Sequence, residues 1–216
     1  MTNQRALLAW SVREPSLLKE ASPRKRTLLD CFCGMGGVSD GFAMEDFDVI
    51  GIDIVDAPKL LGYKHKFIQA DMLTLKGEDF GGFDVVWGSP PCRDFSQLCD
   101  KRGTKTAWKI PKDPRRGLIL INAFLQFVKQ AEPKIWILEN ASGLAKHLTL
   151  KPRALDSKIK GGKRHVFYGN FPNLLIPQTS SIPLAKINCP NRSWERAKIP
   201  LPCSQAFAQA CKEQLQ

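Results

Sequence analysis

The segment LLDCFCGMGGVSDGF, residues 28–42, constrains the fold of this chain most strongly. It joins an apolar run to a glycine-rich turn and then to a helical pattern, which is the start of a βαβ unit. Gly34, Gly36 and Gly37 carry no Cβ, so the turn can approach a bound ligand closely, although a tight structural turn would use the same residues. The dinucleotide fingerprint G-x-G-x-x-G would also require glycine at position 39, where the chain has Ser39. A nicotinamide-dependent oxidoreductase is therefore disfavoured.

Short apolar runs alternate with longer amphipathic stretches along the rest of the chain. This alternation is typical of an α/β protein whose mostly parallel sheet is covered by helices on both faces. At 216 residues the chain fits one domain, or one domain with a small appendage. Helices are expected at 37–44 and 116–131. Strands are expected at 27–31, 49–53, 66–69, 83–87, 135–139 and 166–168.

Acidic residues follow two of the expected strands. Asp53 ends the second strand, at the spacing expected of a carboxylate that binds ribose hydroxyls. Asp71 follows the third strand and is suited to accept a hydrogen bond from an adenine amino group. Because the carboxyl ends of parallel strands meet at one edge of the sheet, these residues predict a nucleoside-containing cofactor lying across that edge.

The segment GSPPCRDFSQL, residues 88–98, places Cys92 behind two prolines after the fourth expected strand. The prolines stiffen this loop, so Cys92 is held on a fixed path. A free thiol is only about 3% thiolate at pH 7, so a nucleophilic cysteine needs help from cations such as Arg93 or the basic residues beyond it. Taken alone, Cys92 fits a nucleophile and a buried structural thiol equally well.

The segment IWILENASGL, residues 135–144, runs an apolar strand into Glu139 and Asn140. A carboxylate at the end of a buried strand is unfavourable unless it has a partner or a chemical role. Beside the Cys92 loop, Glu139 can exchange a proton with a bound heterocycle. A capping or ion-pairing carboxylate is the alternative.

The seven cysteines are irregularly spaced, which predicts free thiols in a reducing compartment. We expect a cytoplasmic protein with no membrane contact, because neither a secretory signal nor an apolar stretch of transmembrane length is present. Cys31 and Cys33 form a C-x-C pair with no second pair at zinc-finger spacing, so no metal site is expected.

In this order and at these separations, DCFCGMGGVSDGF, GSPPCRDFS and ENASGL resemble the motifs of the cytosine-C5 DNA methyltransferases. The segment AKIPLPCSQAFAQACKEQL, residues 197–215, is similar to the family's last motif, which completes the cofactor pocket. The N4-cytosine and N6-adenine methyltransferases are less similar, because their corresponding loop has an aromatic residue in place of Cys92. The resemblance divides the chain into 1–26, a basic N-terminal segment; 27–172, the catalytic domain; 173–192, a short connection in place of a target-recognition domain; and 193–216, a C-terminal segment.

This resemblance implies a Rossmann-like S-adenosylmethionine-dependent methyltransferase fold and a covalent mechanism. Cys92 would add to C6 of a flipped-out cytosine, and Glu139 would engage N3 and the exocyclic amino group. Arg164, in GGKRHVFYGNFP, would contact the flipped nucleotide; the family's Gln-x-Arg-x-Arg arrangement is missing there, and a general phosphate contact is the alternative. The residues implied to bind the cofactor S-adenosyl-L-methionine are Phe32, Gly34, Gly36, Asp53, Ile54, Asp71, Met72, Gly88 and Pro90.

The 32 Lys and Arg residues exceed the 21 Asp and Glu residues, and the net charge of +11 points to a polyanionic partner. Many lie in CDKRGTKTAWKIPKDPRR, residues 99–116, directly beyond Cys92. Such a loop can close over a phosphate backbone with Trp108 stacking or wedging into a duplex. A solvated loop with Trp108 packed on the body is the alternative. The expected nucleic-acid contacts are Lys101, Arg102, Lys105, Trp108, Lys109, Arg115 and Arg116.

Two departures from the family pattern bear on function. Arg93 replaces the usual glutamine of the cysteine loop, and only residues 173–192 stand where typical members insert a target-recognition domain. We expect a DNA (cytosine-5-)-methyltransferase of the restriction-modification type that acts on double-stranded DNA, with relaxed site recognition or a partner protein that supplies it. The alternatives are an RNA cytosine-C5 methyltransferase and a non-catalytic nucleic-acid-binding regulatory subunit. Keeping both Cys92 and Glu139 argues against the regulatory subunit.

Overall fold

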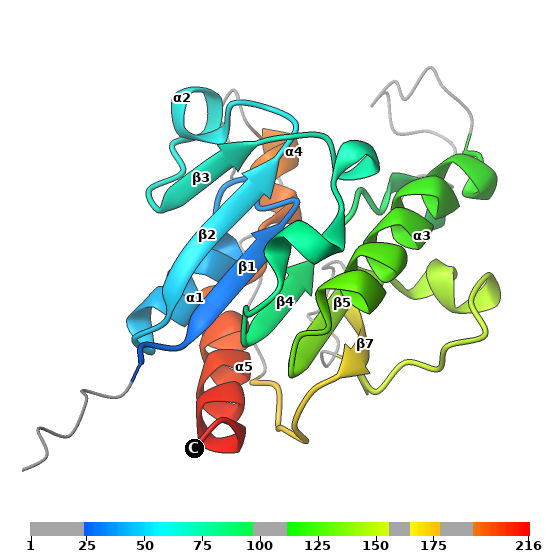
Figure 1. Cartoon of the computed structure of the whole chain (residues 1–216). Coiled ribbons are helices and arrows are strands. Elements are labelled where there is room, and N and C mark those ends of the chain that lie inside the picture. Colours follow the sequence, from blue (N-terminus) through cyan, green and yellow to red (C-terminus); the bar gives the residue numbers. More distant parts are fainter. Residues whose placement is uncertain (1–23, 97–111, 156–164, 178–191) are drawn as a thin grey trace, which may run out of the picture.

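A computed structural model describes residues 24–96, 112–155, 165–177 and 192–216. Its centre is a seven-stranded sheet in the order β3-β2-β1-β4-β5-β7-β6 (Figure 1). The strands from β3 to β5 are parallel, and β7 pairs antiparallel with both β5 and β6. The strands are β1 (Thr27–Cys31), β2 (Asp48–Asp53), β3 (Lys66–Gln69), β4 (Val85–Gly88), β5 (Ile135–Ala141), β6 (Ala154–Leu155) and β7 (His165–Asn170).

Helices cover both faces of the sheet, which confirms the expected Rossmann-like α/β fold (Figure 1). One face packs against α1 (Gly37–Met44) and α5 (Leu201–Gln214), and the other packs against α3 (Pro114–Ala131). The shorter elements are α2 (Ala57–Leu61), α4 (Arg192–Ala197) and the 3₁₀ turns η1 (Met72–Thr74), η2 (Gly77–Phe80), η3 (Arg93–Phe95) and η5 (Ser142–Lys146). None of the described helices is long and apolar enough to cross a bilayer.

The C-terminal helix α5 is an integral part of this core. Phe207 is fully buried, and its ring centroid lies 5.0 Å from that of Trp87 on β4 and 4.8 Å from that of Phe167 on β7. Gly41 of α1 lets the two helices approach closely, because an added Cβ there would lie 2.2 Å from Oγ of Ser204. The last residues of the chain therefore hold one side of the sheet in place.

The expected strand β4 begins later than predicted, at Val85 rather than residue 83. The cause is Asp84, which is buried and binds three groups from elsewhere in the chain. Its carboxylate accepts hydrogen bonds from Arg24 Nη2 at 2.8 Å, Thr27 N at 3.0 Å and Lys134 Nζ at 3.2 Å. Burial opposes ionisation, but these contacts outweigh it and hold the pKa of the Asp84 carboxyl below its ordinary value.

Strand β5 also differs from its predicted range, because it continues past Glu139 to Ala141. The extension comes from antiparallel pairing with β7, in which Ala141 lies opposite His165 and Glu139 opposite Phe167. The other predicted strands keep their positions within two residues, whereas β6 was not predicted. Helix α3 begins at Pro114 because Asp113 caps it by accepting a bond from Arg115 N at 3.0 Å. The predicted segments 1–26 and 173–192 lie largely outside the described residues.

Candidate active site

A cleft of about 470 Å³ lies at the carboxyl ends of β1 and β2, where the strand order reverses between β1 and β4. Its volume is within the roughly 300–1,000 Å³ of small-molecule sites, and this edge of an α/β sheet is where ligands bind. Six of the nine residues expected to bind the cofactor line the cleft: Phe32, Gly34, Asp53, Ile54, Asp71 and Met72.

The other three expected cofactor residues shape the backbone instead of lining the cleft. Gly36 is the N-cap of α1 with φ of 77°, a conformation that favours glycine. Gly88 is buried against Phe124, whose ring would lie 2.4 Å from an added Cβ. The carbonyl of Pro90 accepts a hydrogen bond from Asn140 Nδ2 at 3.0 Å.

The glycine-rich turn and Asp53 hold each other in place. Phe32 and Gly34 have φ of 62° and 50°, and Gly34 N donates to Asp53 Oδ2 at 3.0 Å. Val55 N donates to the other carboxylate oxygen at 3.2 Å. Burial raises the pKa of Asp53 above its ordinary value despite these bonds. A carboxylate can accept about four hydrogen bonds, so Asp53 retains capacity for a ligand.

Asp71 combines a structural contact with its place in the cleft. Its Oδ1 accepts from Leu73 N at 3.0 Å, which caps η1. The capping contact occupies one oxygen of the carboxylate.

A buried polar network beneath the cleft was missed by the sequence reasoning. Asp30 is 1% exposed, lines the cleft and accepts a 2.6 Å hydrogen bond from Ser39 Oγ. Ser39 Oγ also lies 2.8 Å from the hydroxyl of Tyr63. Burial raises the pKa of Asp30 to about 7. A carboxylate inside an apolar run ahead of the glycine turn was the available signal.

Helix α4 and the segment that joins it to α5 close one side of the cleft. Trp194, Ala197, Lys198 and Ile199 contribute to its lining. Gly37 permits this contact, because a Cβ there would lie 2.6 Å from the carbonyl oxygen of Ile199. Sequence reasoning placed this segment near the cofactor but named none of these residues.

Cys92 lies in a loop that is anchored to β1 and β5. Ser89 N donates to the carbonyl of Cys31 at 3.2 Å, and Asn140 Nδ2 on β5 donates to the carbonyl of Pro90. Beyond Cys92, the buried side chain of Phe95 packs against Gly117, and the carbonyl of Phe95 packs against Gly143. Cys92 itself is half-buried and stands at the N-cap position of η3, where its side chain makes no capping bond. It lies beside the cleft without lining it, whereas its neighbour Arg93 does line the cleft.

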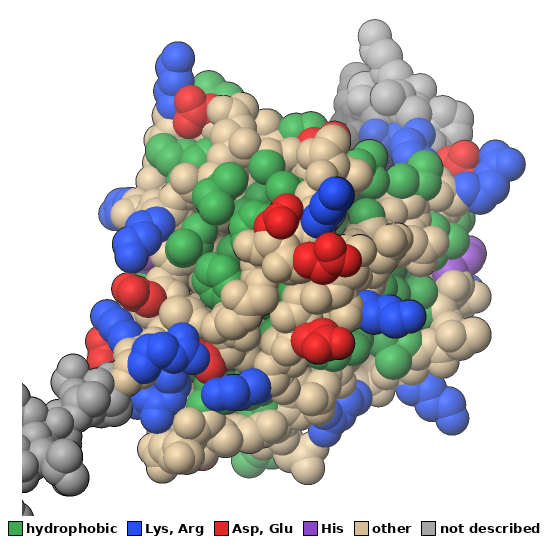
Figure 2. All heavy atoms as spheres, in the orientation of Figure 1, with side chains coloured by type: hydrophobic (Ala, Val, Ile, Leu, Met, Phe, Trp, Pro, Cys, Tyr) green, Lys and Arg blue, Asp and Glu red, His purple; other side chains and the backbone are tan. Residues whose placement is uncertain are grey.

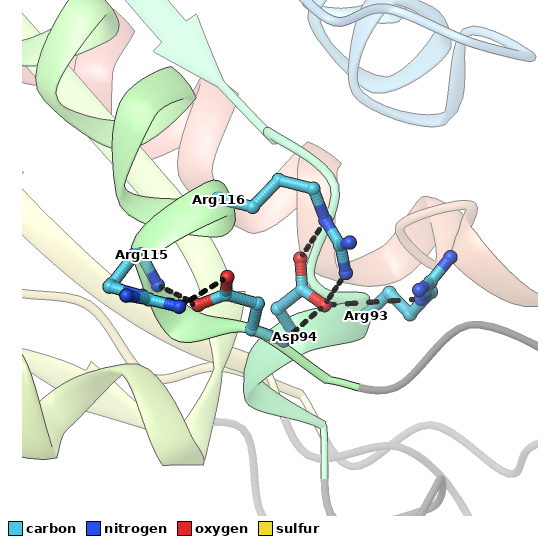
Figure 3. A network of polar contacts seen from close by, with 5 residues as sticks. Arg93, Asp94, Arg115 and Arg116 are labelled. Atoms are coloured by element: carbon cyan, nitrogen blue, oxygen red, sulfur yellow. Dashed lines mark hydrogen bonds and ion pairs between the residues drawn. The ribbon is translucent and has the colours of Figure 1, made fainter.

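The Cys92 loop is also joined to the start of α3 by an ion-pair network (Figure 3). Asp94 accepts hydrogen bonds from Arg116 Nε at 3.1 Å and Asp113 N at 3.2 Å, and Arg93 Nε lies 3.9 Å from the same carboxylate. Burial opposes ionisation of Asp94, but bonds from Arg116 and Asp113 N hold its pKa below the ordinary value. These contacts therefore connect the described residues on either side of segment 97–111.

Two of the expected nucleic-acid contacts lie within the described residues. Arg115 and Arg116 each bind an aspartate, yet their side chains stay 90% and 45% exposed. Figure 2 shows Lys and Arg side chains at this end of the molecule, beside the start of α3. The other expected contacts lie outside the described residues: Lys101, Arg102, Lys105, Trp108 and Lys109.

Glu139 is buried and binds His165, a residue that sequence reasoning did not select. Glu139 Oε1 lies 2.8 Å from His165 Nδ1, and the two side chains are 3% and 5% exposed. Arg164, expected to contact the nucleotide, lies outside the described residues. Within the described part of the chain, no three His, Cys, Asp or Glu side chains are placed to hold a metal ion.

The family model described as C-5 cytosine-specific DNA methylase matches residues 26–161. The chain belongs to this family. Type II methyltransferase M1.HphI from Haemophilus parahaemolyticus is 32% identical over 139 residues, which are 59% of this chain and 36% of that protein. The Probable DNA (cytosine-5)-methyltransferase of Frog virus 3 (isolate Goorha) is 32% identical over 119 residues, 52% of each chain. The chain thus matches about a third to a half of the length of these relatives.

Solved structures of methyltransferases show a likeness at lower identity. A putative DNA modification methyltransferase from an E. coli prophage has a TM-score of 0.48 and 22% identity, over 67% of this chain and 46% of that one. The Entamoeba histolytica methyltransferase EhMeth has a TM-score of 0.48 and 14% identity, over 74% of this chain and 57% of that one.

Proposed function

We propose that this methylase-family chain transfers a methyl group from S-adenosylmethionine to C5 of a flipped-out cytosine in double-stranded DNA. The observation that carries the proposal is the fixed position of Cys92. Its loop is anchored by Asn140 on β5 and its neighbour Arg93 lines the ligand cleft. Glu139, the carboxyl group needed for chemistry at the base, precedes Asn140 on the same strand.

The residues of the cleft fit S-adenosylmethionine. The turn at Phe32 and Gly34 is a cradle of positive-φ backbone, Asp53 offers carboxylate oxygens for ribose hydroxyls, and Asp71 offers one for an adenine amino group. Trp194 lies against Gly34 and gives the C-terminal segment a flat apolar surface for the cofactor. When bound, the cofactor supplies an electrophilic methyl group.

The residues of the chain make the cytosine reactive toward that methyl group. The Cys92 thiolate forms a bond to C6, the C5–C6 π pair shifts to the C4–C5 bond, and the C4–N3 π pair moves onto N3, which takes a proton from Glu139. C5 is then nucleophilic. After substitution at C5, a base removes the C5 proton, the C6–S bond breaks and the thiolate leaves with its electron pair. N3 returns its proton to Glu139, which restores the aromatic ring, the Glu139 carboxyl group and the Cys92 thiolate.

The rim beside Cys92 fits a phosphate backbone. Arg115 and Arg116 stand exposed at the start of α3, and the basic segment 99–116 follows the Cys92 motif in the sequence. Such contacts position a duplex without reading its sequence, so target choice falls to residues outside this rim or to a partner protein. A cytosine must leave the stack to reach Cys92, at a cost of a few kcal/mol.

Transfer of labelled methyl groups from S-adenosylmethionine tests this proposal. The protein is incubated with cytosine-containing duplex DNA and, separately, with tRNA. We expect label in the DNA, none with Cys92→Ala, and normal transfer with Cys203→Ala, a matched change of a buried thiol on α5. Transfer to tRNA alone would contradict the DNA substrate, and transfer to neither would contradict the enzymatic activity.

A further inference from the structure

We propose that His165 is the positioning residue of Glu139, so that an imidazole N–H fixes and stabilises the carboxyl group that serves the target base. This inference rests on the proposed function, because it concerns the same reaction. It adds a role for a histidine in the segment where the family resemblance implied only an arginine.

The register of β5 and β7 places the side chains of Glu139 and His165 next to each other. His165 lies directly opposite Ala141, and Glu139 is two residues from Ala141 on the same face of β5. Diagonal neighbours on one face of an antiparallel pair are within reach of long side chains. The small side chain of Ala141 leaves room between them, and the result is the 2.8 Å contact of Nδ1 with Oε1.

Burial makes this contact a determinant of carboxyl orientation. The side chains of Glu139 and His165 are 3% and 5% exposed, so water does not compete freely for Oε1. The imidazole is itself fixed, since its ring stacks on Phe167 with centroids 6.5 Å apart and an interplanar angle of 21°. Phe167 is fully buried in the core. His165 therefore offers a rigid donor to one carboxyl oxygen.

A donor at this position matters most when Glu139 loses its proton. As Cys92 adds to C6, one proton passes from the carboxyl group of Glu139 to N3 of the cytosine, and a carboxylate remains. With its proton on Nδ1, the imidazole donates a hydrogen bond that is stronger to this carboxylate than to the neutral acid. When N3 returns the proton on release of the thiolate, the pair regains its starting state.

Replacing His165 by Asn and, separately, by Gln distinguishes this role from simple space filling. The Asn side chain places its Nδ2 where the imidazole has Nδ1. The Gln side chain instead places its Nε2 where the imidazole has Nε2. We expect His165→Gln to lower kcat by about 10- to 100-fold, a part of the usual contribution of acid–base catalysis. KM for DNA and the calorimetric Kd for S-adenosylmethionine should stay within about twofold. His165→Asn should retain most of kcat, and the control His65→Gln should resemble the wild type.

A double-mutant cycle with Glu139→Gln covers the case in which His165→Asn fails to fold. If His165 acts through Glu139, His165→Gln causes no further loss in the Glu139→Gln background. Equal losses in both backgrounds, or a Gln variant at least as active as the Asn variant, would overturn the inference while leaving the proposed function intact. A wild-type protein without methyl transfer would instead remove the proposed function and this role together.

Discussion

The position of Cys92 depends on a glycine that lies far from it in the sequence. Gly143 at the start of η5 packs directly on the backbone of Phe95, three residues after Cys92. A Cβ at position 143 would lie 2.1 Å from the carbonyl oxygen of Phe95, where real Cβ contacts stay beyond 3.0 Å. Phe95 and η5 must therefore move apart by about 1 Å in Gly143→Ala. We expect the Cys92 loop to move with Phe95, a displacement that can lower a catalytic rate about 100-fold.

The matched control is Gly81→Ala. Gly81 has φ of −60°, and its added Cβ would meet nothing closer than the Glu78 carbonyl oxygen at 3.8 Å. We expect Gly143→Ala to slow methyl transfer about 100-fold and to lower the free energy of unfolding by about 1–3 kcal/mol through overpacking. Gly81→Ala should change the rate less than twofold. Single-turnover transfer and urea unfolding measure both quantities. Equal rates for the two variants would refute the anchoring of Cys92 by Phe95.

Core packing and the charged side chains also have measurable effects on stability and DNA binding. Phe207→Ala should lower the free energy of unfolding by about 3–5 kcal/mol in urea titrations, because it opens the core between α5 and the sheet. Asp84→Asn should be less stable than the wild type at pH 7, and the difference should shrink as pH falls below about 4, since a carboxyl with lowered pKa stabilises only when ionised. Asp30 has a raised pKa of about 7, so its contribution to stability should fall as pH rises from about 4 to 7, and the stability of the wild type relative to Asp30→Asn should fall over the same range. Arg116→Gln should weaken DNA binding and reduce the salt slope of log K by about 1, measured by fluorescence anisotropy; an unchanged slope would argue against a phosphate contact.

The parallel part of the sheet could be predicted from the sequence because each strand is a local pattern. The ranges 27–31 and 66–69 match β1 and β3 to the residue. The end of β5 was wrong for a non-local reason: a charged residue normally ends an apolar strand, but pairing with β7 carries β5 through Glu139. Likewise, Asp84 delays β4 through contacts with residues far away in the sequence.

In the candidate site, too, the residues marked by local sequence patterns could be predicted, and those brought in by long-range contacts could not. The turn after β1, Asp53 and Asp71 could be found because each lies at or just after the end of a strand in the sequence. Trp194 enters the cleft from the far end of the chain, and no local pattern marks it. His165 could have been found only from the register of β7 against β5, which the sequence does not encode locally.

The most direct test of the central claim is to trap the target base on the protein. Duplex DNA containing 5-fluorocytosine cannot release the C5 substituent that the reaction must remove, so the adduct persists. The protein is mixed with this DNA and S-adenosylmethionine, digested and mapped by mass spectrometry. We predict one covalent adduct, located on Cys92 and absent from Cys92→Ala. An adduct on another cysteine, or none with active wild-type protein, would contradict the account.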